Sequence, residues 1–216
     1  MQKNSIKKIY EEHHKNNREK SFSILEKERG FLFKQFIGEN KKILDIGCRD
    51  GALTKHFSQD NNVLGVDIDE IALGKAKQNL SIDTKIIDLN GNWEELEGEK
   101  FNVIVAGEVL EHLYYPDQVI KKVASYLKEG GIFVGSVPNA FSLKNRLRYL
   151  LGRTKNTPLE DPTHINQFSY KSLNKLLNKN FKEVEIIGLG RFVFLSKILP
   201  NWISFILAFK VKYPKQ

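Results

Sequence analysis

Short apolar runs alternate with amphipathic stretches through most of the chain, which is typical of a sheet covered by helices. The apolar runs predict strands at residues 43–46, 63–67, 84–88, 101–106, 132–137, 183–188 and 204–211. Apolar residues recur at helical spacing in the stretches between them, at 52–57, 71–80, 118–127, 142–153 and 170–178. The run at 101–106 is apolar enough to be buried on both faces, as in a parallel sheet. The predicted fold class is therefore α/β.

Residues 1–40 precede the first predicted strand and have a helical pattern, which ends at Gly38. We expect this N-terminal segment to pack on the sheet edge and to cover part of a bound ligand. The remaining residues, 41–216, are the right length for one domain. The sequence thus predicts an N-terminal helical segment at 1–40 followed by an α/β domain at 41–216.

Composition narrows the expected compartment. The single cysteine, Cys48, excludes a disulfide scaffold and fits a reducing environment. The polar residues 1–20 do not have the pattern of a signal peptide. The longest apolar run, 202–209, is far shorter than the roughly 20 residues that a membrane span needs. We therefore expect a cytoplasmic protein without a transmembrane segment.

The stretch from Ile43 to Gly51 has the strongest chemical pattern in the chain. A strand, two glycines and a helix follow one another, as at the ligand-binding edge of an α/β sheet. The pattern departs from a dinucleotide fingerprint, because Arg49 stands where the middle glycine would be. Asp45 would also repel a phosphate. A cationic ligand without phosphate fits better, and S-adenosylmethionine (SAM), with its sulfonium and ammonium groups, is such a ligand.

These residues resemble the class I SAM-dependent methyltransferases. Asp45-x-Gly47-Cys48-x-x-Gly51 is similar to their first motif, and Asp67 to the acid that ends their second strand. The segment Glu108-Val-Leu-Glu-His-Leu113 is similar to a group that includes ubiquinone-pathway O-methyltransferases and small-RNA 3′-end methyltransferases. The resemblance runs over about residues 41–211 and depends on the order and spacing of the motifs together.

The resemblance implies a Rossmann-like seven-stranded sheet of order 3-2-1-4-5-7-6, with strand 7 antiparallel and helices on both faces. It also implies that SAM is the cofactor. The implied cofactor-binding residues are Asp45, Gly47, Cys48, Gly51, Asp67, Ile68, Asp88 and Leu89. Asp88 and Leu89 would flank the adenine, although Asp88 could instead cap the turn that follows it.

A hydroxyl acceptor must lose its proton during methylation, so a base or a metal is useful. His112 is the expected base, with Glu108 beside it. If residues 108–112 form a helical turn, Glu108, Glu111 and His112 share one face, and His164 could reach them. These four suit Mg²⁺, Mn²⁺ or Zn²⁺ and resemble the metal site of the small-RNA 3′-end methyltransferases. Alternatively, they form hydrogen bonds without a metal.

Residues 141–168 are predicted to be an insertion that forms a substrate lid. The helix expected at 142–153 is basic and amphipathic, and its cations either contact an anionic substrate or membrane surface or form a solvated face. These cations, with one from the loop that follows, are Lys144, Arg146, Arg148, Arg153 and Lys155. The apolar connector at 191–202 could contact lipid or a hydrophobic substrate, or pack on the sheet or in a dimer.

Three functions remain open at this point. The first is O-methylation of a small-molecule, lipid-precursor or glycan hydroxyl. The second is metal-dependent 2′-O-methylation of RNA, which the net charge of +8 favours; against it, no separate RNA-binding module is recognisable. The third is a non-catalytic scaffold with the same fold, although a scaffold would need neither the glycines nor the strand-end acids. Scattered surface lysines would also account for the charge without any polyanionic partner.

Overall fold

The computed structural model describes residues 25–190 and 198–215. Residues 1–24 of the predicted N-terminal segment lie outside this range. So do residues 191–197, the first part of the predicted apolar connector. Within the described residues, no helix is long and apolar enough to cross a bilayer.

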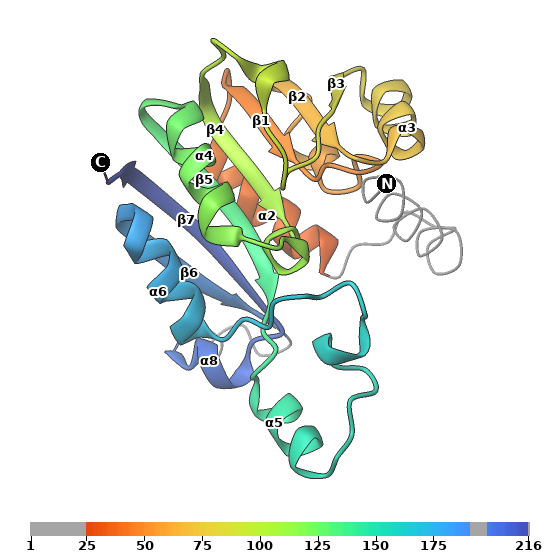
Figure 1. Ribbon diagram of the computed structural model, residues 1–216, viewed down its shortest axis with the longest axis vertical. Coiled ribbons are helices and arrows are strands. Elements are labelled where there is room, and N and C mark those ends of the chain that lie inside the picture. The colour runs from red at the N-terminus through yellow and green to blue at the C-terminus, as the bar shows by residue number, and fades with distance from the viewer. Residues whose placement is uncertain (1–24, 191–197, 216) are drawn as a thin grey trace.

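In the described part of the chain, seven strands form one sheet in the order β3-β2-β1-β4-β5-β7-β6 (Figure 1). The neighbours from β3 to β5 pair in parallel, and β7 pairs antiparallel with both β5 and β6. This order and the antiparallel strand 7 confirm the predicted fold. The strands are β1 (Lys42–Ile46), β2 (Asn62–Asp67), β3 (Asp83–Ile86), β4 (Phe101–Gly107), β5 (Leu127–Pro138), β6 (Phe181–Leu189) and β7 (Ile206–Pro214).

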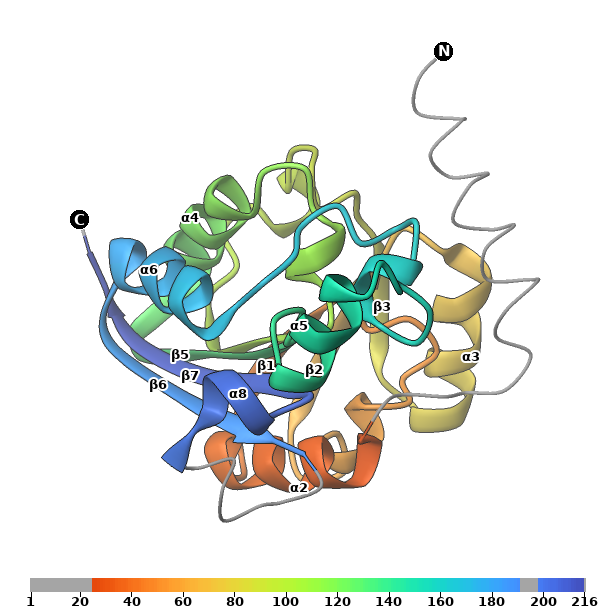
Figure 2. The same ribbon diagram turned by 90° about the horizontal axis from the view of Figure 1, so that it is seen from below.

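Helices cover both faces of the sheet, again as predicted (Figure 2). On one face, α4 (Pro116–Tyr126) and α6 (Tyr170–Asn180) bury Val123 and Leu177 in the larger core cluster. Phe133 of β5 belongs to the same cluster. Helix α6 begins where it does because the Ser169 hydroxyl accepts a hydrogen bond from the Ser172 N–H, within a capping box.

The opposite face is covered by α2 (Glu26–Ile37) and α3 (Glu70–Leu80). Phe33 and Ala76 from these helices join the second core cluster with Ile43 of β1. The central strands are therefore buried on both sides, which accounts for their continuous apolar runs.

Three predicted elements are shorter in the structure. The helix expected at 52–57 is only a 3₁₀ turn, η1 (Thr54–His56). The strand expected to end at Asp88 ends at Ile86, so Asp88 is not a strand-end residue. The helix expected at 142–153 is α5 (Leu143–Leu150), because the chain turns at Gly152, whose φ of +65° favours glycine.

The carboxyl ends of β1, β4 and β5 lie at the same edge of the sheet, and the segment 141–168 extends beyond that edge (Figure 1). This segment contains α5 and η4 (Pro158–Glu160). The remaining short elements are η2 (Glu94–Leu96), η3 (Leu110–His112) and α8 (Pro200–Ile203).

Phe133 gives a direct test of the core. Its fully buried ring packs edge-on to Phe209, with centroids 5.1 Å apart, and lies 6.2 Å from the ring of Phe181. We expect Phe133→Ala to lower the free energy of unfolding by about 3–5 kcal/mol, because it leaves a cavity beside the rings of Phe181 and Phe209. Urea unfolding measures this. The exposed Ile71→Ala should stay within about 0.5 kcal/mol of wild type; equal effects of the two substitutions would contradict the assignment.

Candidate active site

The turn after β1 brings the backbone close to its neighbours. Gly47 and Gly51 have φ of +70° and +80°. A Cβ at Gly47 would lie 2.6 Å from a Val109 methyl carbon, so only glycine fits there. Arg49 also has a positive φ, +52°. Its N–H donates a 3.0 Å hydrogen bond to Asp67 Oδ2, which holds this residue in the left-handed conformation where the dinucleotide motif has a glycine.

Asp45, near the end of β1 and just before this turn, carries a buried carboxyl. Its Oδ2 accepts a 2.6 Å hydrogen bond from the Thr54 hydroxyl. The pKa of Asp45 is raised to about 7, mainly by burial and to a smaller extent by the charge of Asp67, while the hydrogen bond from Thr54 opposes the shift. Burial also raises the pKa of Asp67, against the hydrogen bonds from the N–H groups of Asp69 and Arg49. These two carboxyls, near the ends of the neighbouring strands β1 and β2, make the site attractive to a cation.

A cavity of about 740 Å³ opens at the carboxyl edge of the sheet. Of the predicted cofactor residues, it is lined by Asp45, Gly47 and Cys48. The predicted catalytic and metal residues Glu108, Glu111, His112 and His164 also line it. Five predicted cofactor residues are outside this lining: Gly51, Asp67, Ile68, Asp88 and Leu89.

Of these five, Asp88 and Leu89 lie in the loop after β3. Asp88 Oδ1 accepts a hydrogen bond from the Asn90 N–H, so Asp88 caps this turn, which is the alternative that its sequence position left open. Leu89 packs against the core, and its carbonyl accepts a hydrogen bond from the Trp93 indole. Ile68 is half-buried directly after β2.

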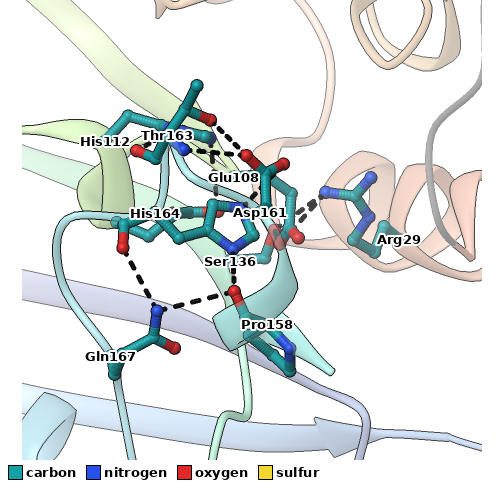
Figure 3. Close-up of polar contacts among 10 residues, drawn as sticks. Arg29, Glu108, His112, Ser136, Pro158, Asp161, Thr163, His164 and Gln167 are labelled. Carbon is teal, nitrogen blue, oxygen red and sulfur yellow. Dashed lines mark hydrogen bonds and ion pairs between the residues drawn. The ribbon is translucent and has the colours of Figure 1, made fainter. Parts of the chain in front are cut away.

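Glu108 does not share a helical face with Glu111 and His112, so that prediction is wrong. Only Leu110–His112 form a 3₁₀ turn, and Glu108 precedes it with a φ of +61°. Its carboxylate accepts a 3.0 Å hydrogen bond from the Ser136 hydroxyl, and Oε1 lies 3.4 Å from Nη1 of Arg29 (Figure 3). Glu108 therefore faces α2 and β5.

Arg29 is a site residue that the sequence pattern did not single out. Its side chain, on α2, is 1% exposed, lines the cavity and donates a 3.0 Å hydrogen bond to the Ser136 hydroxyl. One signal was available: Arg29 lies four residues before Phe33 and eight before Ile37, on the buried face of the helix. A cation in that position requires a buried counter-charge, and here Glu108 supplies it.

Three predicted metal ligands come together. Glu111, His112 and His164 each offer a ligand atom, all within 4.8 Å of one another. Nδ1 of His112 lies 3.0 Å from the Thr163 carbonyl oxygen, and Nδ1 of His164 lies 2.9 Å from that of Pro158 (Figure 3). Because a carbonyl only accepts, Nδ1 carries the proton in both rings, and Nε2 has the lone pair when the ring is neutral.

Glu111 is the most unusual of the three. Burial raises its pKa well above the usual range, and the charge of Glu108 raises it further. In the part of the chain that the structure describes, neither of its carboxylate oxygens accepts a hydrogen bond. A buried carboxyl without such partners is costly, so this one is either protonated or meets a cation.

The comparisons with known proteins agree on one family. The family described as "Methyltransferase domain" matches residues 16–182. The chain is 35% identical over 97 residues to a ubiquinone biosynthesis O-methyltransferase of Dechloromonas aromatica, covering 42% of this chain and 41% of that relative. The chain spans about half the length, or less, of the curated relatives that it matches first.

Solved structures share the fold. A SAM-dependent methyltransferase from Archaeoglobus fulgidus has a TM-score of 0.67 at 17% identity, covering 94% of this chain and 99% of the other. The N-methyltransferase NodS from Bradyrhizobium japonicum WM9, in complex with S-adenosyl-L-homocysteine, has a TM-score of 0.62 at 20% identity, covering 88% of this chain and 87% of the other. At these identities, the likeness establishes the fold.

The raised pKa of Asp45 predicts a pH-dependent stability. Its folded pKa of about 7 exceeds the ordinary value of 3.8, so the folded protein holds the extra proton between the two values. Stability contributed by this proton is lost as the pH rises. Relative to Asp45→Asn, the unfolding free energy of wild type should fall by about 1.4 kcal/mol per pH unit from pH 5 to 7, then level off. Urea unfolding across this range measures it; parallel curves for the two proteins would contradict the assignment.

Proposed function

The chain belongs to the class I SAM-dependent methyltransferases, and on this premise we propose that it transfers the methyl group of SAM to a hydroxyl of a small molecule, lipid precursor or glycan. The observation that carries the proposal is the arrangement at one cavity of an acidic glycine turn and a histidine with a defined tautomer. The turn would hold the cofactor, and the histidine would accept the proton of the hydroxyl. Membership of an enzyme family favours this function over the scaffold alternative.

The residues present fit SAM. Asp45 offers a buried carboxyl to the ammonium group, and Gly47 lets the backbone approach the ligand. The Arg29 guanidinium, which lines the same cavity, suits the carboxylate of the methionine part. Asp67, the last residue of β2, is the proposed partner of the ribose hydroxyls, since a carboxylate that accepts two N–H bonds still has acceptor capacity.

His112 is the proposed general base. Its Nδ1–H donates to the Thr163 carbonyl, so the neutral ring presents Nε2 as the acceptor of the hydroxyl proton. Glu111 Oε1, 4.0 Å from Nε2, would stabilise the imidazolium that results. Residues 141–168 would act as the lid that excludes water from the transfer.

A second candidate, metal-dependent 2′-O-methylation of RNA, is favoured by the group of Glu111, His112 and His164. The unsatisfied carboxylate of Glu111 fits a cation, and two imidazoles favour Mn²⁺ or Zn²⁺ over Mg²⁺. The carbonyls bonded to both Nδ1 atoms would orient the rings as outer-sphere partners do at metal sites. Bound there, a metal would lower the pKa of the acceptor hydroxyl. Glu108, paired with Arg29, would be left out of the ligand set.

The acceptor class is tested by label transfer. We would incubate the protein with methyl-labelled SAM and fractions of lipid, glycan, small molecules and RNA, with and without EDTA. We expect label in a non-RNA fraction, and at least about tenfold less with Asp67→Ala, because a hydrogen bond from a ligand to a charged group is lost. Asp60→Ala, which removes an exposed carboxylate paired with Lys34, is the matched control. Label in RNA that vanishes with EDTA would replace the first candidate by the second.

The metal is tested separately by calorimetric titration with Mn²⁺. If the metal candidate holds, wild type binds one ion, and Glu111→Gln weakens binding at least about tenfold. The affinity should also rise with pH, because burial raises the pKa of Glu111 and the ion must displace its proton. The exposed Glu129→Gln serves as the control. No binding to wild type would leave His112 as a base acting without a metal.

A further inference from the structure

Helix α5 presents an uncovered apolar face at the active edge of the molecule. Leu143, Leu147, Leu150 and Leu151 recur at helical spacing, so they lie on one side of this helix and its last turn. Their side chains are 46%, 54%, 82% and 68% exposed. In Figure 1, α5 lies beyond the edge of the sheet. Four exposed leucines in so short a segment are unusual on a protein surface without a partner.

The apolar face continues onto α8 and the residues after it. The Arg146 guanidinium lies over the Trp202 ring, 4.8 Å from its centroid, and Lys144 Nζ is 5.4 Å from the centroid of Phe205. Both rings remain partly exposed, at 43% and 37%. We call the six residues Leu143, Leu147, Leu150, Leu151, Trp202 and Phe205 the docking surface.

Positive charge accompanies these apolar residues. Residues 143–155 contain five basic side chains and no acidic one. Of these, Arg153 and Lys155 are exposed just beyond the leucines. Long basic side chains around a leucine face are the composition of helices that lie in the headgroup region of an anionic bilayer.

Other occupants fit less well. A second copy of the chain would bring two clusters of cations together, and like charges across an interface disfavour association. Nucleic acid would bind the cations through its phosphates. It would leave the leucines exposed, because the bases of single strands stack on aromatic rings. An anionic bilayer satisfies both the charge and the apolar area.

The docking surface also borders the cavity. Lys144 and Phe205 line the cavity, and so do Asn145 and Pro158 from the same insertion. We propose that this surface binds an anionic lipid bilayer, so that an acceptor carried in the membrane enters the cavity from the bilayer. The identity of the acceptor depends on the proposed function, whereas binding to the bilayer does not.

Vesicle co-sedimentation tests the proposal with the full chain. Wild type should sediment with vesicles of phosphatidylcholine that contain about one-third phosphatidylglycerol, but not with pure phosphatidylcholine, and binding should weaken with salt. Leu147→Glu/Leu150→Glu and Arg153→Glu/Lys155→Glu should each lower the partition coefficient at least about tenfold. The matched controls are Phe31→Glu/Ile71→Glu, two exposed apolar residues of α2 and α3, and Lys75→Glu/Lys77→Glu on α3.

Several outcomes would overturn the proposal. One is wild type that stays in the supernatant with anionic vesicles; another is a leucine variant that sediments like wild type. A dimer that the leucine variant converts to a monomer, without vesicle binding, would assign the surface to self-association. RNA binding that survives the leucine substitutions, without vesicle binding, would assign the cations to nucleic acid.

Calorimetry with S-adenosylhomocysteine on the same preparations separates this proposal from the proposed function. Wild type that binds the cofactor but does not bind anionic vesicles contradicts the docking surface alone. Cofactor binding absent from wild type, with vesicle binding kept, contradicts the proposed function alone. Folding of each variant is checked by its urea midpoint, which should match wild type because all the substituted side chains are exposed.

Discussion

The ion pair between buried Arg29 and partly buried Glu108 determines much of the structure at the carboxyl edge of the sheet. A guanidinium that is 1% exposed must meet a counter-charge, and Glu108 meets it by leaving the end of β4 in a left-handed conformation. This turn delays the following 3₁₀ helix until Leu110, so Glu108 lines the cavity from outside the helical turn that carries Glu111 and His112. Ser136 of β5 bonds both partners and connects α2, β4 and β5 at one point.

The sequence was sufficient for the architecture because its signals were local. Apolar runs and glycines each identified an element, and the resemblance supplied the strand order. The glycine turn was also readable, because Gly47 and Gly51 mark positions that require a positive φ. The elements that could be predicted are those whose formation depends on residues close to them in the sequence.

The predictions that were wrong concern residues whose conformation depends on contacts far apart in the sequence. Arg29 and Ser136 are 107 residues apart, so no local pattern predicts their hydrogen bond. Glu108 was assigned to a helical face by spacing alone, but the distant cation overrides that spacing. Asp88 was predicted to end a strand because the predicted strand extended two residues beyond the end of β3 at Ile86. Where the backbone conformation depends on an ion pair with a distant residue, it cannot be predicted until that tertiary contact is known.

The contacts of the two histidines tie the chemistry to the insertion. The carbonyls that orient the rings of His112 and His164 belong to Thr163 and Pro158, both within residues 141–168. The insertion thus orients both histidine rings through its main-chain carbonyls, independently of its side chains. If this segment moved outward, the tautomer of His112 would lose its support at the moment that the cavity opened. Substrate entry and proton removal by the proposed base, His112, would then exclude each other, because the ring would have its supported tautomer only in the closed arrangement.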